Sequence, residues 1–125
     1  MRCLKHRPGS RLGGGNISEK GWGHEVWIEN DVYCGKLLVF NAGKKCSMHF
    51  HLNKTETMYL QDGKIVIDLR DPETGEDYLV EMNPGDSLKI PRGQLHQIVA
   101  IADSHLFEFS THHEDSDSYR AWKGD

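Results

Sequence analysis

Three histidines and one glutamate occur in this chain at a spacing that suits a metal ion. His49 and His51 are separated by one residue, Glu56 follows five residues later, and His96 ends a later glycine-bounded stretch. Side chains alternate between the faces of a β-strand, so His49 and His51 point the same way. Neutral imidazoles and a carboxylate suit divalent first-row transition metals. We therefore expect these four residues to bind one manganese, iron, zinc, nickel or cobalt ion, with coordination positions left open for substrate.

The pattern around these residues predicts short β-strands that position them. Apolar or β-branched runs bounded by turn residues predict strands at 24–30, 33–40, 45–51, 57–61, 64–69, 77–82, 87–90, 95–100 and 105–110. Asp62-Gly63 and the stretch 83–86, Asn-Pro-Gly-Asp, are turn signals between predicted strands. About nine short strands with regularly spaced turns indicate an all-β sandwich or barrel.

Length, charge and cysteine content restrict the class of protein. The 125 residues suit one domain, and the net charge of −4 argues against nucleic-acid binding. We expect no membrane partner, because no apolar run is long enough to span a bilayer and no signal peptide is visible. Cys3, Cys34 and Cys46 are odd in number and form no Cys-x-x-Cys pair, so we interpret them as reduced thiols of a cytoplasmic protein.

The composition divides the chain into three expected parts. Residues 1–21 combine basic side chains with Pro8 and the triple glycine 13–15, and are expected to form a flexible basic leader. Residues 22–112 form the predicted barrel, and residues 113–125 form an acidic C-terminal tail. An open barrel edge with apolar side chains invites pairing with another chain, so we expect a homodimer.

The stretches that carry the four candidate ligands resemble the two sequence motifs of the cupin family. They match at nine positions, which are Gly43, His49, His51, Glu56, Gly63, Gly85, Pro91, Gly93 and His96. One departure is Ala100, where the second motif usually has asparagine. The resemblance implies a cupin barrel, also called a double-stranded β-helix or jelly roll. This fold hosts enzymes of several classes as well as binding proteins, so it does not name the reaction.

Outside the motifs, the chain is similar to the C-terminal cupin domain of type II mannose-6-phosphate isomerases. The residues that carry this similarity are Trp22-Gly23, Glu25, Tyr33, Lys36, Leu38, Ser47, Ile90-Pro91, Phe107-Glu108-Phe109 and the acidic stretch 114–120. That family often has glutamine at the position of His49 and arginine at the position of Gln97. The similarity implies a metal-dependent isomerase or epimerase that acts on a small-molecule substrate, a sugar or a sugar phosphate.

Five further side chains are candidates to act on such a substrate. Glu108 lies on the last predicted strand, where its carboxylate could face the interior, and is our candidate for the general base. Lys36 and Arg120 are candidates to bind a phosphate or a sugar hydroxyl. Strand parity places Ser47 and Gln94 on the same inward faces as the histidines, so both are candidates for substrate binding.

Two other functions are compatible with the same four ligands. Three histidines and a glutamate with open positions can also hold iron(II) and oxygen, as in a non-haem iron dioxygenase. Alternatively, the barrel could be a non-catalytic module that binds a sugar or another small molecule. Oxygen consumption would identify the first function, and ligand binding without turnover would identify the second.

Overall fold

The computed structural model describes residues 10–125, so part of the expected leader, residues 1–9, lies outside the described residues. The described residues form eleven β-strands and one short 3-10 helix, η1. The elements are β1 (Asn16–Lys20), β2 (Gly23–Asn30), β3 (Tyr33–Phe40), β4 (Met48–Phe50), β5 (Glu56–Asp62), β6 (Ile65–Arg70), β7 (Asp77–Met82), β8 (Ser87–Ile90), β9 (Leu95–Ala100), β10 (Ser104–Thr111), η1 (Asp115–Asp117) and β11 (Tyr119–Trp122).

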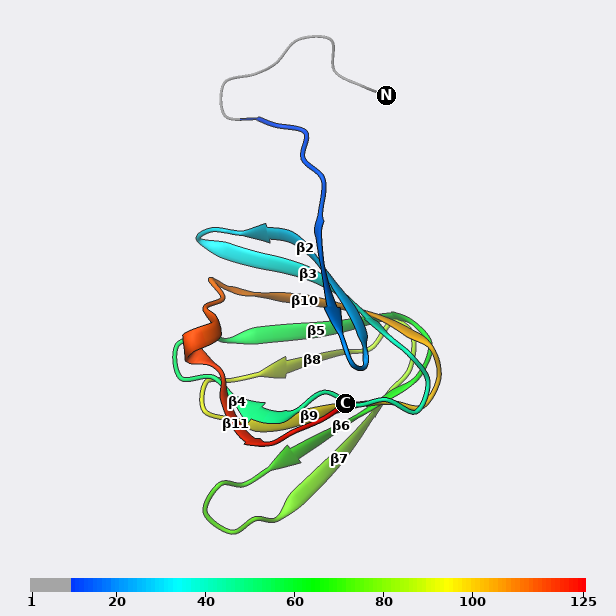
Figure 1. The fold of residues 1–125 in the computed structure, drawn as a ribbon. Coiled ribbons are helices and arrows are strands. Elements are labelled where there is room, and N and C mark those ends of the chain that lie inside the picture. The colour runs from blue at the N-terminus through cyan, green and yellow to red at the C-terminus, as the bar shows by residue number, and fades with distance from the viewer. Residues whose placement is uncertain (1–9) are drawn as a thin grey trace.

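The strands form two antiparallel sheets that lie face to face (Figure 1). The first sheet, called sheet A, has the strand order β1-β2-β3-β10-β5-β8. The second, called sheet B, has the order β11-β4-β9-β6-β7. Some neighbours in each sheet come from distant parts of the sequence, as in the pairing of β10 with β3 and β5. This arrangement confirms the predicted all-β jelly-roll fold.

The inward face of sheet A changes along the strands from apolar to ionisable. On β10, Leu106 and Glu108 both point inward and both are buried. Leu106 pairs in register with Leu38 of β3 and Leu60 of β5, whereas Glu108 pairs with Lys36 of β3. Strand alternation thus continues without interruption while the chemistry of the inward residues changes. One end of the barrel is a hydrophobic core, and the other end is a polar interior.

The hydrophobic core fills the space between the apolar ends of the two sheets. Its members are Trp22, Leu38, Phe40, Cys46, Met58, Leu60, Ile65, Ile67, Met82, Ile90, Ile98, Ala100 and Leu106. The turn that leads from β5 into β6 requires a glycine at its centre. Gly63 has a φ of 91°, and a Cβ atom there would overlap Ser104 and the backbone of Asp103. This turn reverses the chain from sheet A to sheet B.

Strands β1 and β11 lie in segments for which the sequence predicted no strand. In the expected leader, Asn16–Lys20 forms β1 and pairs with β2 along its whole length. In the expected acidic tail, η1 is followed by β11, which pairs with β4 at the edge of sheet B. The predicted strand 45–51 is shorter in the structure and comprises Met48–Phe50, with Lys45 forming an isolated bridge to Val99.

The outer face of sheet A carries exposed apolar side chains. Ile28, Tyr33, Tyr59 and Phe109 are at least one-third exposed and border a shallow groove of about 580 Å³. The homodimer stays a prediction, as does the cytoplasmic location. Within residues 10–125, the structure contains no helix with the length and apolar character that crossing a membrane requires.

Candidate metal centre and its cavity

The three predicted histidine ligands lie together on sheet B. His49 is the central residue of β4, His51 follows that strand directly, and His96 on β9 pairs in register with His49. One nitrogen from each ring lies within 4.8 Å of the others. The ring centroid of His49 lies 4.4 Å from that of His96 and 5.0 Å from that of His51. The structure therefore brings residues separated by more than forty positions into one group.

The backbone fixes which nitrogen each of these rings presents to the others. The Nδ1 atom of His49 lies 2.9 Å from the carbonyl oxygen of Ser47, and that of His96 lies 2.9 Å from that of Gln94. The Nδ1 atom of His51 lies 3.1 Å from the carbonyl oxygen of Asp117. A carbonyl only accepts, so each Nδ1 carries the proton and donates it. Each Nε2 atom then keeps its lone pair, as a metal ligand requires.

Glu56 borders the histidine group from β5 of the opposite sheet. Its Oε1 atom lies 2.9 Å from the Nε2 atom of His96 and 3.9 Å from that of His51. Its Oε2 atom lies 3.1 Å from the Nζ atom of Lys54. Within residues 10–125, neither oxygen of Glu56 makes a hydrogen bond, and neither does His96 Nε2. Buried lone pairs that face one another in this way suit a divalent transition metal held by three imidazoles and one carboxylate.

The electrostatic environment keeps the candidate ligands in the form that binds a metal. Burial, followed by the effect of His96, lowers the pKa of His49 to about 3. Burial, followed by the effect of Lys54, lowers the pKa of His51 to about 4. Burial would raise the pKa of Glu56, but His96 and Lys54 outweigh it and hold that pKa below its usual range. At neutral pH, these histidines are neutral and the glutamate is ionised.

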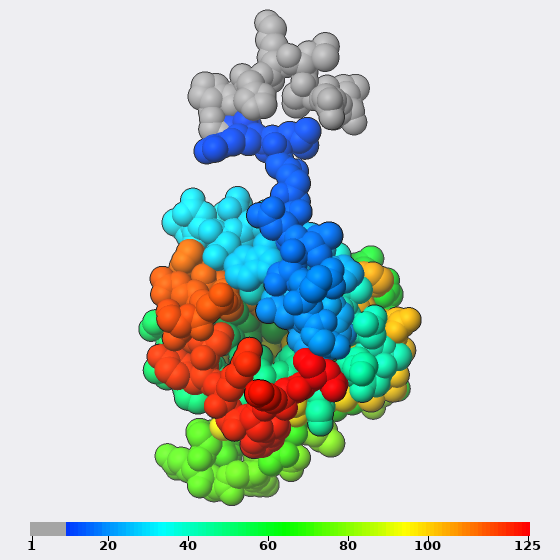
Figure 2. All heavy atoms as spheres, in the orientation of Figure 1, coloured from blue at the N-terminus to red at the C-terminus, as the bar shows by residue number. Residues whose placement is uncertain are grey.

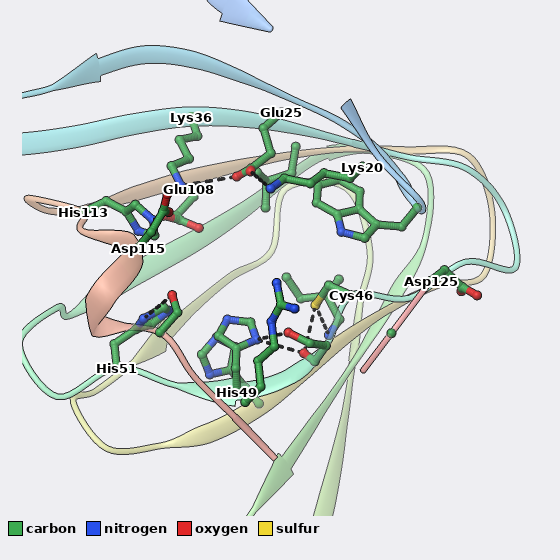
Figure 3. A pocket seen from close by; sticks show the side chains of 18 of the residues that line it. Lys20, Glu25, Lys36, Cys46, His49, His51, Glu108, His113, Asp115 and Asp125 are labelled. Carbon is green, nitrogen blue, oxygen red and sulfur yellow. Dashed lines mark hydrogen bonds and ion pairs between the residues drawn. The ribbon is translucent and has the colours of Figure 1, made fainter. Parts of the chain in front are cut away.

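The histidines open into a cavity of about 670 Å³ between the two sheets. Figure 3 shows His49 and His51 on one side of this cavity, and Glu25, Lys36, Glu108 and His113 on the other. In Figure 2, a recess lies between the blue N-terminal strands, the orange end of β10 and the red C-terminal segment. A volume of this size suits a small polar molecule such as a monosaccharide.

Glu108 lies in this cavity, within a buried network centred on Lys54. The Nζ atom of Lys54 lies 3.0 Å from Oε2 of Glu108, 3.1 Å from Oε2 of Glu56 and 2.9 Å from Nδ1 of His113. Burial and the charge of Glu56 raise the pKa of Glu108. Burial acts to lower the pKa of Lys54, but Glu108 and Glu56 raise it above its usual value. Lys54 thus remains a cation that connects a candidate metal ligand to the candidate base.

Lys36 occupies the same cavity but is already paired. Its Nζ atom donates a hydrogen bond of 3.2 Å to Oε2 of Glu25 and lies 3.9 Å from the ring centroid of Trp27. Lys20 reaches the other oxygen of Glu25 at 3.3 Å. Lys36 and Glu25 are both buried, so the pair forms a fixed polar wall rather than a mobile charge.

Two more of the expected substrate-binding residues line the cavity, and one lies elsewhere. Ser47 and Arg120 both line it, and Arg120 pairs in register with His49, which places it beside the metal centre. Gln94 does not line the cavity. Its side-chain amide instead donates hydrogen bonds to the carbonyl oxygens of Arg70 and Leu95. The backbone carbonyl of Gln94, rather than its side chain, serves the site by accepting from His96.

Sequence reasoning missed Lys54, Glu25, His113 and Asp117, which all contribute to the site. Lys54 lies two positions before Glu56, in the loop that precedes β5, where strand parity does not assign the direction of its side chain. His113 and Asp117 lie in a polar segment without strand or helix periodicity. His113 lines the cavity and Asp117 contacts the loop before β5 only because the segment after β10 turns back toward β4 (Figure 1).

Asp117 joins this returning segment to the strand that bears the histidines. Its carboxylate accepts hydrogen bonds from the backbone N–H groups of Leu52 at 3.0 Å, Asn53 at 3.1 Å and Lys54 at 3.1 Å. Its own carbonyl accepts from His51. Asp117 is buried despite lying in an otherwise exposed stretch. One residue therefore orders the loop that carries Lys54 and orients a candidate metal ligand.

Sequence and structure comparisons give the relationships of the chain. The chain is 29% identical to the D-lyxose/D-mannose isomerase of Thermosediminibacter oceani, an alignment that covers 83% of this chain and 70% of that protein.

Among solved structures, the capsular polysaccharide assembling protein CapF from Staphylococcus aureus is similar, with a TM-score of 0.79 and 18% identity over 93% of this chain. Oxalate decarboxylase from Bacillus subtilis gives a TM-score of 0.73 and 15% identity over 90% of this chain. The chain spans about a third of the length of both, 34% and 33%. KdgF from Halomonas sp. gives a TM-score of 0.68 and 18% identity, and the match covers 81% of this chain and 89% of KdgF. At these identities, the structures show a shared fold.

The family comparison is consistent with the geometry of the site. The sequence model of the family described as Cupin matches residues 35–121, which include the three clustered histidines, Glu56 and Glu108. The chain therefore belongs to the cupin family.

Proposed function

We propose that the protein is a metal-dependent isomerase or epimerase that removes the proton next to the carbonyl of an open-chain sugar or sugar phosphate and returns it to the neighbouring carbon or to the opposite face of the same carbon. The observation that carries this proposal is the position of Lys54 Nζ, which is in contact with both Glu56 and Glu108. A candidate base is thereby held next to a candidate metal centre, within one cavity. The relative named D-lyxose/D-mannose isomerase supports the same class of reaction.

The proposed metal ligands are His49, His51, His96 and Glu56, whose donor atoms fit a divalent transition metal as described above. When bound, such an ion supplies Lewis-acid stabilisation of negative charge on the oxygens of the substrate. The remaining steps fall to side chains of the cavity.

Glu108 is the proposed general base. A carboxylate in this position removes the proton from the carbon next to the carbonyl, which leaves an enediolate. In an isomerase it returns the proton to the former carbonyl carbon while the hydroxyl proton passes to the former carbonyl oxygen; in an epimerase the original carbon is reprotonated on its opposite face. A base is most effective when its pKa lies near the working pH, and burial raises the pKa of Glu108 in that direction. Lys54 opposes this shift and fixes the carboxylate by an ion pair of 3.0 Å. The balance between burial and Lys54 sets the proton affinity of Glu108.

The other lining residues are proposed to bind and orient the substrate. Arg120 lies beside His49 and, among the described residues, has no recorded ion pair, so its guanidinium is available to a sugar oxygen or a phosphate. Lys36 and Glu25 form a buried pair whose remaining donors and acceptors suit sugar hydroxyls. Ser47 offers a hydroxyl on the same wall as His49.

Elemental analysis followed by a sugar panel tests this proposal. We expect about one metal ion per chain in the parent and loss of that ion in a His49→Ala/His96→Ala double variant. With metal bound, D-lyxose, D-mannose and their phosphates are the first substrates to incubate with the protein, and products are separated by chromatography. Full metal occupancy without turnover of any sugar would contradict the isomerase, and no metal after reconstitution would contradict the centre itself.

A single substitution then tests the base. Glu108→Gln keeps the shape of the side chain but removes the carboxylate, so proton exchange with the solvent should be abolished while the metal stays bound. Glu76→Gln, in the exposed loop between β6 and β7, is the matched control and should behave like the parent. Retained exchange in Glu108→Gln would remove Glu108 from the mechanism.

A further inference from the structure

His113 is a buried histidine of the cavity that the proposed reaction does not yet use. It follows β10 and is only 9% exposed. Its Nδ1 atom lies 2.9 Å from Nζ of Lys54, and its Nε2 atom lies 3.0 Å from Oδ1 of Asp115, whose side chain is exposed. Figure 3 shows His113 and Asp115 next to Glu108 at the end of the cavity.

His113 completes the set of partners around the Lys54 ammonium group. An ammonium carries three N–H donors and no acceptor. The three partners within reach are Oε2 of Glu56 at 3.1 Å, Oε2 of Glu108 at 3.0 Å and Nδ1 of His113 at 2.9 Å. Lys54 donates hydrogen bonds to Glu108 and His113 and forms an ion pair with Glu56, and together these contacts fix the position of Nζ. Loss of His113 or Glu108 leaves a buried N–H group of Lys54 without its hydrogen-bond acceptor.

These contacts also fix the tautomer of His113. Because Lys54 can only donate, Nδ1 of His113 must accept, so the ring proton lies on Nε2 and is donated to Asp115. Burial and the neighbouring Lys54 and Lys36 lower the pKa of His113, which favours this neutral form. The tautomer is opposite to that of His49, His51 and His96. Both ring nitrogens of His113 already have partners, so it does not serve as a further metal ligand.

We propose that His113 is a positioning residue for proton transfer, which acts by holding Lys54 Nζ between Glu56 and Glu108, with Asp115 orienting the His113 ring. This inference rests on the proposed isomerase function. The contribution of His113 is geometric, because Lys54 sets the orientation and charge environment of the Glu108 carboxylate. Without the hydrogen bond to His113, the ammonium group is no longer held at one point, and the carboxylate that moves the proton loses its alignment.

Two substitutions at position 113 separate positioning from a merely structural role. His113→Leu removes the acceptor, whereas His113→Asn keeps one, since Oδ1 of asparagine takes the place of Nδ1. With the manganese-loaded protein and D-mannose or D-lyxose as the probe, His113→Leu should lower kcat about 10- to 100-fold and leave KM and metal content nearly unchanged. His113→Asn should recover most of this loss. His112→Leu, at the exposed neighbouring position, is the matched control.

Nuclear magnetic resonance tests the same contact without any turnover. The Lys54 ammonium protons should be visible in proton–nitrogen spectra of the parent and of His113→Asn, because they are buried and hydrogen-bonded, and should be lost in His113→Leu. Long-range spectra should report the Nε2–H tautomer of His113.

If the parent converts neither sugar, the isomerase proposal fails for these sugars, and the spectra alone decide whether His113 holds Lys54. A Nδ1–H tautomer, unchanged ammonium signals in His113→Leu, or a parent-like kcat in that variant would each overturn the positioning role.

Discussion

Removing the Asp117 carboxylate should weaken both the fold and the metal centre. In Asp117→Ala, the backbone N–H groups of Leu52, Asn53 and Lys54 lose an acceptor at 3.0–3.1 Å. Hydrogen bonds to a charged group contribute about 1.5–3 kcal/mol each, but Leu52 and Asn53 are exposed residues whose N–H groups water can reach, so we expect a total loss of about 2–4 kcal/mol. Asp117→Asn keeps one acceptor oxygen and should lose about half as much, roughly 1–2 kcal/mol.

The loss should also reach the metal, because the same residue orients His51. The carbonyl of Asp117 accepts from His51 Nδ1 at 3.1 Å, and its position depends on the anchored carboxylate. Loss of such an outer partner costs about 10- to 100-fold in metal affinity. The change in unfolding free energy and the change in affinity therefore arise from one side chain and should occur together.

Urea unfolding of the metal-free protein and a competitive metal titration measure the two effects. For Asp117→Ala, the unfolding midpoint should fall by about 1–2 M urea, with an unchanged slope. Glu114→Ala is the matched control, since Glu114 precedes the same 3-10 helix, is exposed and makes no capping hydrogen bond. A midpoint within error of the parent, together with parent-like affinity, would refute the reasoning that Asp117 joins the C-terminal segment to the site.

Three further outcomes follow from the packing and charge of the site. Lys54→Met leaves the buried carboxylates of Glu56 and Glu108 without their cation, so the unfolding free energy of the metal-free protein should fall by about 3–5 kcal/mol in urea. Ala100→Asn restores the side chain usual in the second cupin motif, but Ala100 is 1% exposed within the core, and overpacking should cost about 1–3 kcal/mol and lower Tm by calorimetry. Burial raises the pKa of the Cys46 thiol to about 12, so at pH 8 this thiol should resist iodoacetamide in the native protein, as read by peptide mass spectrometry. Rapid labelling of Cys46 without unfolding would contradict the expected protection of this thiol.

The strands that enclose the site could be predicted because each has one buried face. Buried positions alternate along β3, and β6 begins with the β-branched run Ile65–Ile67, so both leave a pattern in the sequence. Strands β1 and β11 lack this pattern, since they lie at sheet edges with nearly every side chain exposed. Their pairing comes from backbone hydrogen bonds, which do not depend on side-chain type. Neither the largely polar β1 nor the four-residue β11 therefore shows the alternation by which a strand is predicted.

Some residues of the candidate site could be predicted from local sequence spacing, whereas others depend on contacts between distant segments. The ligand spacing of His49, His51 and Glu56 is local, and the structure groups the two histidines with His96 as expected. The side chain of Gln94 does not point inward as expected, because the turn before β9 interrupts strand alternation. The N–H group of Gln94 donates a hydrogen bond to the carbonyl oxygen of Pro91 in this turn. Parity counted from His96 does not extend across a turn.

The returning C-terminal segment determines when a growing chain can complete the candidate metal centre. Asp117 supports Leu52 across a separation of 65 residues, so His51 is synthesised long before the carbonyl that orients it. At about 5–20 residues per second, that separation corresponds to roughly 3–13 s of translation. During the first part of this interval, His49 and His51 are present without β9 beside them, and during all of it they are present without β11. The candidate ligands and the carbonyl that orients His51 are consequently assembled only in the finished barrel, so we expect a metal to bind there and not to the nascent chain.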